Sequence, residues 1–164
     1  MRTLKPQPLT HAAFAPFGNV IDAEKASGLP INYGAATRFD DLAEVDVSEG
    51  GGRVTVSLFR ARRLPEPITI EIMERHPLGS QAFMPLDRLP FVVVVAPKGD
   101  LNPDSIAAFI ARGGQGVNIG KGVWHHFLLA LRDGSEFLVI DRVGPGDNLD
   151  EVRLSPAEQW RVEI

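Results

Sequence analysis

Two short segments of the sequence contain the side chains best suited to chemistry, and the first of them carries Glu74 and His76. Because side chains alternate along a strand, both would share a face with Ile68, Ile70 and Ile72 and would point toward the interior. Burying a carboxylate and an imidazole costs free energy unless the groups are paired or bound. The pair therefore indicates a metal site or an acid–base pair, unless the strand ends before Glu74 and both groups are solvated.

The second segment is Gly122-Val-Trp-His-His126. Adjacent residues in a strand point to opposite faces, so only one of the two histidines can enter a given site. An imidazole can transfer a proton or bind a metal near neutral pH, which makes either histidine a candidate. The alternative is a histidine that is simply paired within the core.

A β-hairpin is predicted to follow, with its turn at Asp133-Gly134. Counting back from that turn, His126 would lie opposite Asp141, and His125 opposite Arg142. We then expect Asp141 to support His126 by holding its tautomer and orientation. A slip of one residue in the register would undo this pairing.

Arginine side chains could bind an anionic substrate, because a planar guanidinium clamps a carboxylate with two hydrogen bonds. The arginines near the candidate segments are Arg38, Arg60, Arg75 and Arg142. Asn32 is a further polar group, although the geometry of a turn would also explain an asparagine there.

Apolar alternation and turn residues predict many short strands. We expect strands over 19–22, 53–60, 68–76, 91–96, 115–119, 127–132 and 135–143, and one more strand or turn within 151–164. The strand that begins at residue 53 should be half buried, with Val54, Val56 and Leu58 on its apolar face. Phe91–Ala96 is a continuous apolar run, typical of a strand buried on both faces.

Two helical segments are predicted beside these strands. A single turn over His11–Phe14 would be capped by Thr10, and a longer helix would begin after Asn102 with Pro103 at its first position and end at Gly113-Gly114. Many strands, one real helix and frequent turns indicate a mainly β fold, either a barrel or a sandwich.

Length and composition exclude several classes of protein. A chain of 164 residues is expected to form one domain over residues 1–164. It has no cysteine, which excludes disulfides, thiolate zinc sites and a cysteine nucleophile. A net charge of −4 without a basic cluster gives no reason to expect nucleic acid as a partner. No signal peptide or membrane-spanning segment is recognised, so we expect a cytoplasmic protein.

Four motifs taken together resemble the ureidoglycolate lyase (ureidoglycolate hydrolase-type) family of allantoin degradation. They are Glu74-Arg-His-Pro-Leu-Gly-Ser-Gln-Ala-Phe83, Gln115-Gly-Val-Asn118, Val123-Trp-His-His126 and Ile140-Asp-Arg142. Their order and spacing match along nearly the whole chain, from Phe14–Gly18 to the end. The resemblance implies a homodimer of cupin domains that releases urea from ureidoglycolate and leaves glyoxylate. The fold implied is a cupin-like double-stranded β-helix (jelly-roll barrel) with one or two short helices.

The resemblance to cupins can be followed residue by residue. Glu74, His76 and Gln81 fall at the spacing of the first cupin motif, where cupins usually have two histidines and a glutamate. Gly122 and His125 fit the second motif. The resemblance thus implies that Glu74, His76, Gln81 and His125 could hold a divalent metal, nickel in this family, without an organic cofactor.

The implied elimination needs a base, an acid and a cationic group for the substrate carboxylate. We assign the proton transfers to His76 and Glu74, unless they are metal ligands, and expect His125 to polarise the hydroxyl group or bind the metal. The substrate-binding candidates are Arg38, Arg75 and Arg142 for the carboxylate, and Asn32, Ser80 and Gln81 for the ureido group. The alternatives are an ammonia-releasing ureidoglycolate amidohydrolase and a non-catalytic cupin that binds a small carboxylate.

Overall fold

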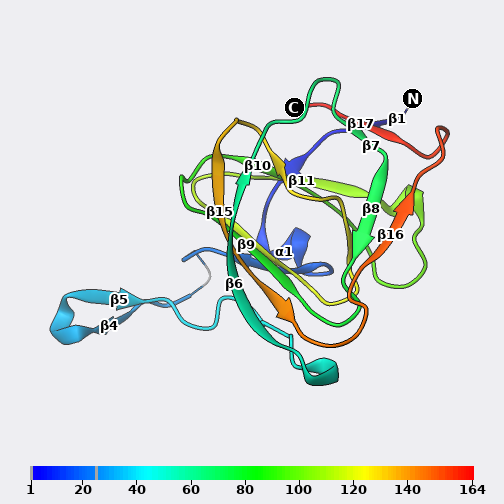
Figure 1. Ribbon diagram of the computed structural model, residues 1–164. Helices are drawn as coiled ribbons and strands as arrows, with labels where there is room; N and C mark the ends of the chain where they lie inside the picture. Colours follow the sequence, from blue (N-terminus) through cyan, green and yellow to red (C-terminus); the bar gives the residue numbers. More distant parts are fainter. Residues whose placement is uncertain (1, 25) are drawn as a thin grey trace.

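Strands make up 43% of the chain and helices 8%, which confirms the mainly β prediction. The computed structural model describes residues 2–24 and 26–164. Two large sheets pack face to face as a cupin-like β-sandwich, and a small sheet lies against the outer side of one of them (Figure 1). We call the space between the two large sheets the interior.

The first large sheet has seven strands and carries the two histidine segments. Its strands are, in spatial order, β16 (Asp150–Arg153), β8 (Ile72–Arg75), β13 (Trp124–His125), β10 (Phe91–Ala96), β11 (Ala107–Ala111) and β2 (Gln7–Pro8), with β14 (Leu129–Ala130) also paired to β10. Every residue of β10 is buried, as its continuous apolar sequence predicts.

The second large sheet has five strands and forms the opposite wall of the interior. Its order is β3 (Gly18–Ile21), β12 (Gly116–Ile119), β9 (Gln81–Pro85), β15 (Ser135–Val143) and β6 (Arg53–Ala61). The last strand, β6, has a neighbour on one side only and pairs with β15 along its whole length, from Arg53 to Ala61.

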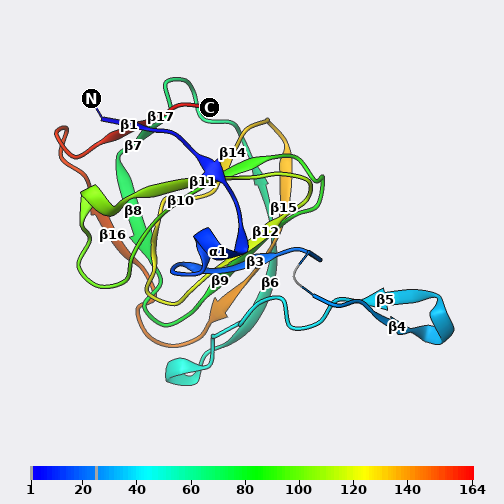
Figure 2. The same ribbon diagram turned by 180° about the vertical axis from the view of Figure 1, so that it is seen from behind.

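The remaining elements are short. A three-stranded sheet contains β1 (Arg2–Leu4), β17 (Trp160–Val162) and β7 (Thr69–Ile70). The hairpin of β4 (Leu29–Ile31) and β5 (Ala36–Arg38), joined by the 3₁₀ turn η1 (Asn32–Gly34), projects away from the sandwich as an arm (Figures 1 and 2). The helical pieces are α1 (His11–Phe14), capped by Thr10 as predicted, η2 (Glu49–Gly51) and η3 (Pro103–Ser105).

Two apolar cores hold the layers together. The interior core joins both large sheets and includes Phe83, Val93, Val95, Val117 and Val139. The second core lies between the seven-stranded sheet and the small sheet, and includes Ile70, Met73, Val92, Val94 and Trp124. Alternate residues of β10 thus enter opposite cores, because successive side chains of a strand point to opposite faces.

The longer helix predicted after Asn102 is not formed. Asn102 does act as a cap, since its side chain accepts a hydrogen bond from the backbone N–H of Asp104 at 3.0 Å, but the helical segment ends at Ser105. Residues Ala107–Ala111 instead form β11, which pairs antiparallel with the buried strand β10. Pairing with a buried strand thus outweighs the local helical pattern.

The predicted hairpin around Asp133-Gly134 is also wrong. The chain does turn there, but β14 before the turn pairs with β10 in the seven-stranded sheet, whereas β15 after it pairs with β6 and β9 in the other sheet. The turn therefore connects two layers instead of two neighbouring strands. The C-terminal region, predicted to hold one strand, contains both β16 and β17.

The single strand predicted over 68–76 is divided at Glu71 into β7 and β8, which join different sheets. Ile70 and Met73 belong to the second core, so Glu74 lies on the opposite face of β8 and points toward the interior. The inward position of Glu74 is confirmed, but of the three isoleucines only Ile72, two residues away in β8, shares its face, whereas Ile68 and Ile70 belong to the second core.

Strand β6 forms as predicted, but its two faces are exchanged. Val54, Val56 and Leu58 are 49%, 62% and 66% exposed on the outer face of the sheet. Thr55 and Ser57 alternate with them and are half buried on the interior side. Among the described residues, no helix has the length and apolar character needed to span a membrane.

Candidate functional site

A cluster of polar side chains lies in the interior where β8 and β13 end and β9 begins. His125 lies opposite both Val95 and Glu74 in adjacent antiparallel strands, and residues paired in this way share a face. From the facing sheet come Gln81, two residues before the interior residue Phe83, and Asp141, two residues after Val139. Two β-sheets thus converge on one site.

The metal-ligating atoms of Glu74, His76 and His125 all lie within 4.8 Å of one another. Nε2 of His125 is 3.4 Å from Oε1 of Glu74, and the two imidazole rings have their centroids 5.1 Å apart. A carboxylate and two imidazoles at this spacing offer one oxygen and two nitrogens to a common point, which is a typical ligand set for a divalent metal.

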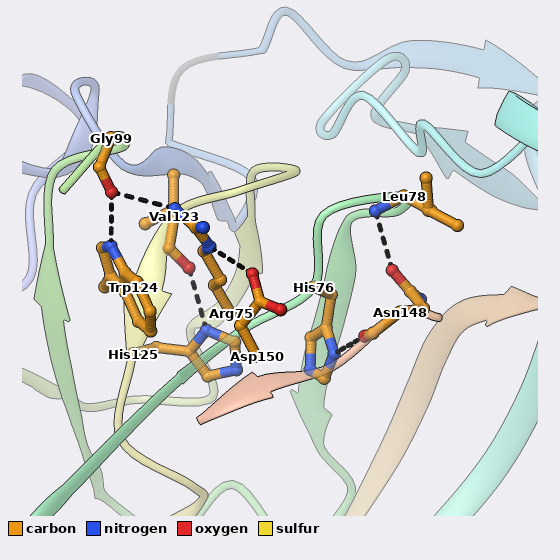
Figure 3. Close-up of polar contacts among 9 residues, drawn as sticks. All are labelled: Arg75, His76, Leu78, Gly99, Val123, Trp124, His125, Asn148 and Asp150. Carbon is orange, nitrogen blue, oxygen red and sulfur yellow. Dashed lines mark hydrogen bonds and ion pairs between the residues drawn. The ribbon is translucent and has the colours of Figure 1, made fainter. Parts of the chain in front are cut away.

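His76 is oriented through its Nδ1 atom, which donates a hydrogen bond to the backbone carbonyl of Asn148 at 2.8 Å (Figure 3). The Asn148 side chain in turn accepts a hydrogen bond from the backbone N–H of Leu78 at 2.8 Å, so the loop before β16 is tied to the loop after β8. Since Nδ1 carries the proton of a neutral imidazole here, Nε2 of His76 presents a lone pair to the site.

Gln81 presents its carbonyl to that lone pair. Its Oε1 lies 3.2 Å from Nε2 of His76, while its Nε2 donates a hydrogen bond to Oδ2 of Asp141 at 3.0 Å. Two acceptors that face each other attract only when a proton lies on the imidazole nitrogen or a cation binds both.

His125 is held like His76, with one ring nitrogen on a backbone carbonyl and the other facing a side-chain oxygen. Its Nδ1 donates to the carbonyl of Val123 at 3.1 Å, and its Nε2 faces the carboxylate of Glu74. The residue is only 2% exposed, and Nε2 has no hydrogen-bond partner within the described part of the chain. This buried nitrogen again needs a proton or a cation, and its position beside His76 and Glu74 fits a metal ligand.

Electrostatics favours the charged form of the carboxylate. The His125 imidazole, 3.4 Å from the carboxylate, lowers the pKa of the Glu74 carboxyl, against the opposing effect of burial. Burial lowers the pKa of the neighbouring His126 imidazole, which favours its neutral form. The site thus combines an ionised carboxylate with imidazole nitrogens whose other ring nitrogens are held by backbone carbonyls.

His126 also faces the interior, where it lines a small cavity together with core residues such as Phe83 and Val117, and a bulge follows β13. The backbone N–H of His126 donates to the carbonyl of Val94, yet Leu129 is the partner of Val92, so one extra residue is inserted between these two points. Nδ1 of His126 lies 2.9 Å from the carbonyl of Phe127. The predicted pairing of His126 with Asp141 is therefore wrong.

Asp141 lies opposite Thr55 and supports Gln81, because β15 belongs to the five-stranded sheet. Nothing in the local sequence indicated this contact, which joins residues 60 positions apart. The carbonyl of Asn148 was missed for the same reason, since any residue type can supply a backbone carbonyl.

Three further predicted residues have their side chains engaged outside this cluster. Arg75 donates to Asp150 and to the carbonyl of Gly99, and its guanidinium stacks on Trp124 at 4.5 Å (Figure 3). Arg142, predicted to pair with His125, instead donates to the carbonyls of Glu49 and Pro145, and Ser80 accepts from the backbone N–H of Asp46. Their roles in substrate binding stay predictions.

Asn32 and Arg38 lie on the projecting arm, and Arg38 is paired with Asp40 at 2.6 Å. The structure does not bring them to the cluster within one chain. Of the predicted substrate-binding residues, Gln81 alone lies beside Glu74, His76 and His125.

The sandwich and its inward-facing imidazoles and carboxylate define a cupin-like protein with a candidate metal or acid–base centre. Comparison with known proteins identifies the family to which this cupin-like chain belongs. The chain belongs to the ureidoglycolate lyase family, which it matches over residues 1–163.

Relatives named ureidoglycolate lyase match nearly the full length of the chain. The one from Burkholderia mallei is 54% identical over 163 residues, covering 99% of this chain and 95% of that protein. Those from Azotobacter vinelandii and Pseudomonas syringae pv. tomato are 53% and 50% identical, covering 97% and 92% of this chain and 96% and 89% of theirs. Among solved structures, a dTDP sugar isomerase from Desulfovibrio desulfuricans gives a TM-score of 0.35 at 16% identity, covering 89% of this chain and 85% of that one.

Proposed function

We propose that this chain is a carbon–nitrogen lyase that converts ureidoglycolate to urea and glyoxylate in allantoin degradation. The observation that carries the proposal is the full-length match to relatives named ureidoglycolate lyase. The substrate carbon bears a carboxylate, a hydroxyl group and a ureido nitrogen. A base removes the hydroxyl proton as the C=O bond forms, the C–N bond breaks, and an acid protonates the departing nitrogen.

Glu74, His76 and His125 are the groups we propose for this chemistry. Glu74 and His76 either transfer the protons or hold a metal ion, and His125 polarises the hydroxyl group or binds that ion. A pair of imidazoles held by backbone carbonyls beside an ionised carboxylate offers both an acid and a base in one site. Replacing His76 by Ala is expected to abolish urea release, and unchanged turnover in this variant would contradict the assignment.

We propose further that the site binds a divalent cation through Glu74, His76, Gln81 and His125. The support is the pair of nitrogen–oxygen contacts, His76 with Gln81 and His125 with Glu74, which a cation would make favourable at once. Such an ion would supply positive charge for the substrate hydroxyl and carboxylate oxygens. Because a carboxylate has two oxygens, Glu74 could hold the cation with one and accept a proton with the other.

Nickel is the ion that the resemblance implies. Metal analysis of the purified protein before and after chelation tests this point. We expect one divalent ion per chain and loss of urea release after chelation, restored by Ni²⁺. Full activity of a protein free of metal would leave Glu74 and His76 as a pure acid–base pair.

Arg38, Arg75 and Arg142 remain our candidates for the substrate carboxylate, and Asn32, Ser80 and Gln81 for the ureido group. Gln81 has the best support, because its carbonyl faces the cluster. Single alanine variants should separate them, since loss of a group that binds the ground state raises KM with little change in kcat.

We also propose that the protein is a cytoplasmic homodimer. The support is the outer face of the five-stranded sheet, where Val54, Val56 and Leu58 are exposed beside the half-buried Leu138 and Ile140. The ion pair of Arg60 with Glu136 flanks this strip. An apolar strip with a charged margin is typical of a protein interface.

The product distinguishes the proposed function from its alternatives. A lyase releases urea and glyoxylate from ureidoglycolate, whereas an amidohydrolase releases ammonia. A cupin that only binds a small carboxylate would release neither product but would bind glyoxylate. We expect stoichiometric urea and glyoxylate, and ammonia in place of urea would overturn the lyase assignment.

A further inference from the structure

We propose that Asp141 is a positioning residue that decides which end of the Gln81 amide faces His76. The proposal rests on the function and cation site proposed above, and it concerns a contact between two adjacent strands of the five-stranded sheet, β9 and β15. Among the described residues, Asp141 makes no hydrogen bond to either imidazole. It acts by accepting a hydrogen bond from Nε2 of Gln81 at 3.0 Å.

The two ends of the Gln81 amide have opposite chemistry, since the carbonyl oxygen accepts hydrogen bonds and the NH₂ group donates them. An ionised carboxylate only accepts, so Asp141 selects the NH₂ end. The carbonyl oxygen must then face Nε2 of His76, at 3.2 Å. Within the described residues, the hydrogen bond from Gln81 is also the only one that the Asp141 side chain makes.

The reversed amide would disable the site. Nδ1 of His76 is committed to the carbonyl of Asn148, so Nε2 carries the lone pair. A Gln81 turned by 180° would donate an N–H to that lone pair and satisfy it internally. The reversed orientation is therefore favoured by His76 alone, and it is prevented because it would bring two oxygens together at Asp141.

Because Gln81 is buried, the orientation of its amide strongly affects the site. Gln81 is 7% exposed, so water cannot easily satisfy whichever end loses its partner. In this account Asp141 keeps both a carbonyl oxygen and an imidazole lone pair available to a cation or to the substrate. Removing such a supporting partner typically lowers metal affinity about 10- to 100-fold.

The test uses the full chain, freed of metal, with Ni²⁺ alone as the probe in calorimetry. We expect Asp141→Ala to bind Ni²⁺ roughly 10- to 100-fold more weakly than the wild type. The double variant Gln81→Glu with Asp141→Asn exchanges the amide and the carboxylate between the two positions. The amide on β15 can then donate to one oxygen of the carboxylate on β9, and the other oxygen faces His76, so affinity should return to near the wild-type value.

Asp87→Ala is the matched control. Asp87 also lies by the five-stranded sheet and accepts hydrogen bonds, from the backbone N–H groups of Leu89 and Glu136, but it is outside the site. The Ni²⁺ affinity of the Asp87→Ala protein should equal that of the wild type. Wild-type affinity in Asp141→Ala, or a double variant no better than Asp141→Ala, would overturn the proposal.

A second measurement needs no metal. In the metal-free protein at mildly alkaline pH, the ¹⁵N resonance of His76 Nε2 should report an unbonded nitrogen in the wild type and a hydrogen-bonded one in Asp141→Ala. An identical resonance in both proteins would refute the positioning role even if Ni²⁺ does not bind. Failure of the proposed function is separate, because it would appear as the absence of urea release by the wild type.

Discussion

The exposed apolar face of β6 gives the most quantitative prediction. If a second copy covers this face, a charge placed at its centre should separate the dimer without unfolding the chain. Val56 is suitable because it is 62% exposed and lies between Val54 and Leu58 along the strand. We therefore consider Val56→Asp.

The expected effect follows from the exposed fraction of Val56. Complete burial of a valine side chain contributes about 1.5–3 kcal/mol, so burial of the exposed 62% contributes about 1–2 kcal/mol for each copy. A two-fold interface contains the residue twice, which gives about 2–4 kcal/mol. At about 1.4 kcal/mol for each factor of ten, the dissociation constant should rise by roughly 30- to 700-fold, before the cost of burying a carboxylate is added.

Sedimentation equilibrium over a range of protein concentrations measures this shift. Val152→Asp is the matched control, since Val152 is a valine on β16, the edge strand of the other sheet, and is 37% exposed. The melting temperature of a monomeric Val56→Asp should show that the fold persists, because an exposed substitution usually changes stability by about 0.5 kcal/mol or less. A Val56→Asp protein with the wild-type dissociation constant would refute this interface, and a monomeric wild type at micromolar concentration would refute the dimer.

Three further predictions concern the site. His125→Ala should abolish Ni²⁺ binding, measured by calorimetry, whereas His126→Phe should keep it, because Nε2 of His125 is aimed at Glu74 and His126 is not among the clustered ligand atoms. The pKa of Glu74 is lowered in the folded state, so its stabilising contribution is complete above the ordinary glutamate pKa and is lost as the pH falls through the lowered value. In urea unfolding from pH 6 to pH 3, the free energy of unfolding should therefore fall less steeply with pH in Glu74→Gln than in the wild type. An unchanged slope would contradict the contact with His125. Arg75→Ala should lower the melting temperature and change KM little, because its guanidinium contacts Asp150, Gly99 and Trp124. A large rise in KM at unchanged melting temperature would instead assign Arg75 to substrate binding.

The sequence predicts the local features of this fold better than its long-range pairings. The buried strand β10 and the cap at Thr10 follow from adjacent residues, and both are confirmed. The helix after Asn102 and the hairpin at Asp133-Gly134 fail because the partner strands are decided by distant parts of the chain. Local pattern cannot distinguish a turn within a sheet from a turn between sheets.

The candidate site likewise combines residues that the sequence predicts with contacts that it does not predict. Glu74, His76, Gln81 and His125 were found from strand alternation and motif spacing, and the structure brings them together. The contacts that orient them were not found, since they come from backbone carbonyls and from Asp141 on a strand whose pairing was mispredicted. A correct register for β15 would have placed Asp141 beside Gln81.

The exchanged faces of β6 connect the proposed dimer with the proposed site. In an isolated sandwich, a strand with valines at alternate positions would turn them inward, because burial of apolar side chains stabilises the fold. Here the interior side carries Thr55, directly opposite Asp141, while Val56 faces outward. Turning the strand over would place its valines beside the polar cluster and would leave no apolar outer face for a second copy to cover. A second copy on the outer face would remove that conflict, since the same strand could then bury its apolar side chains and still present polar ones to the site.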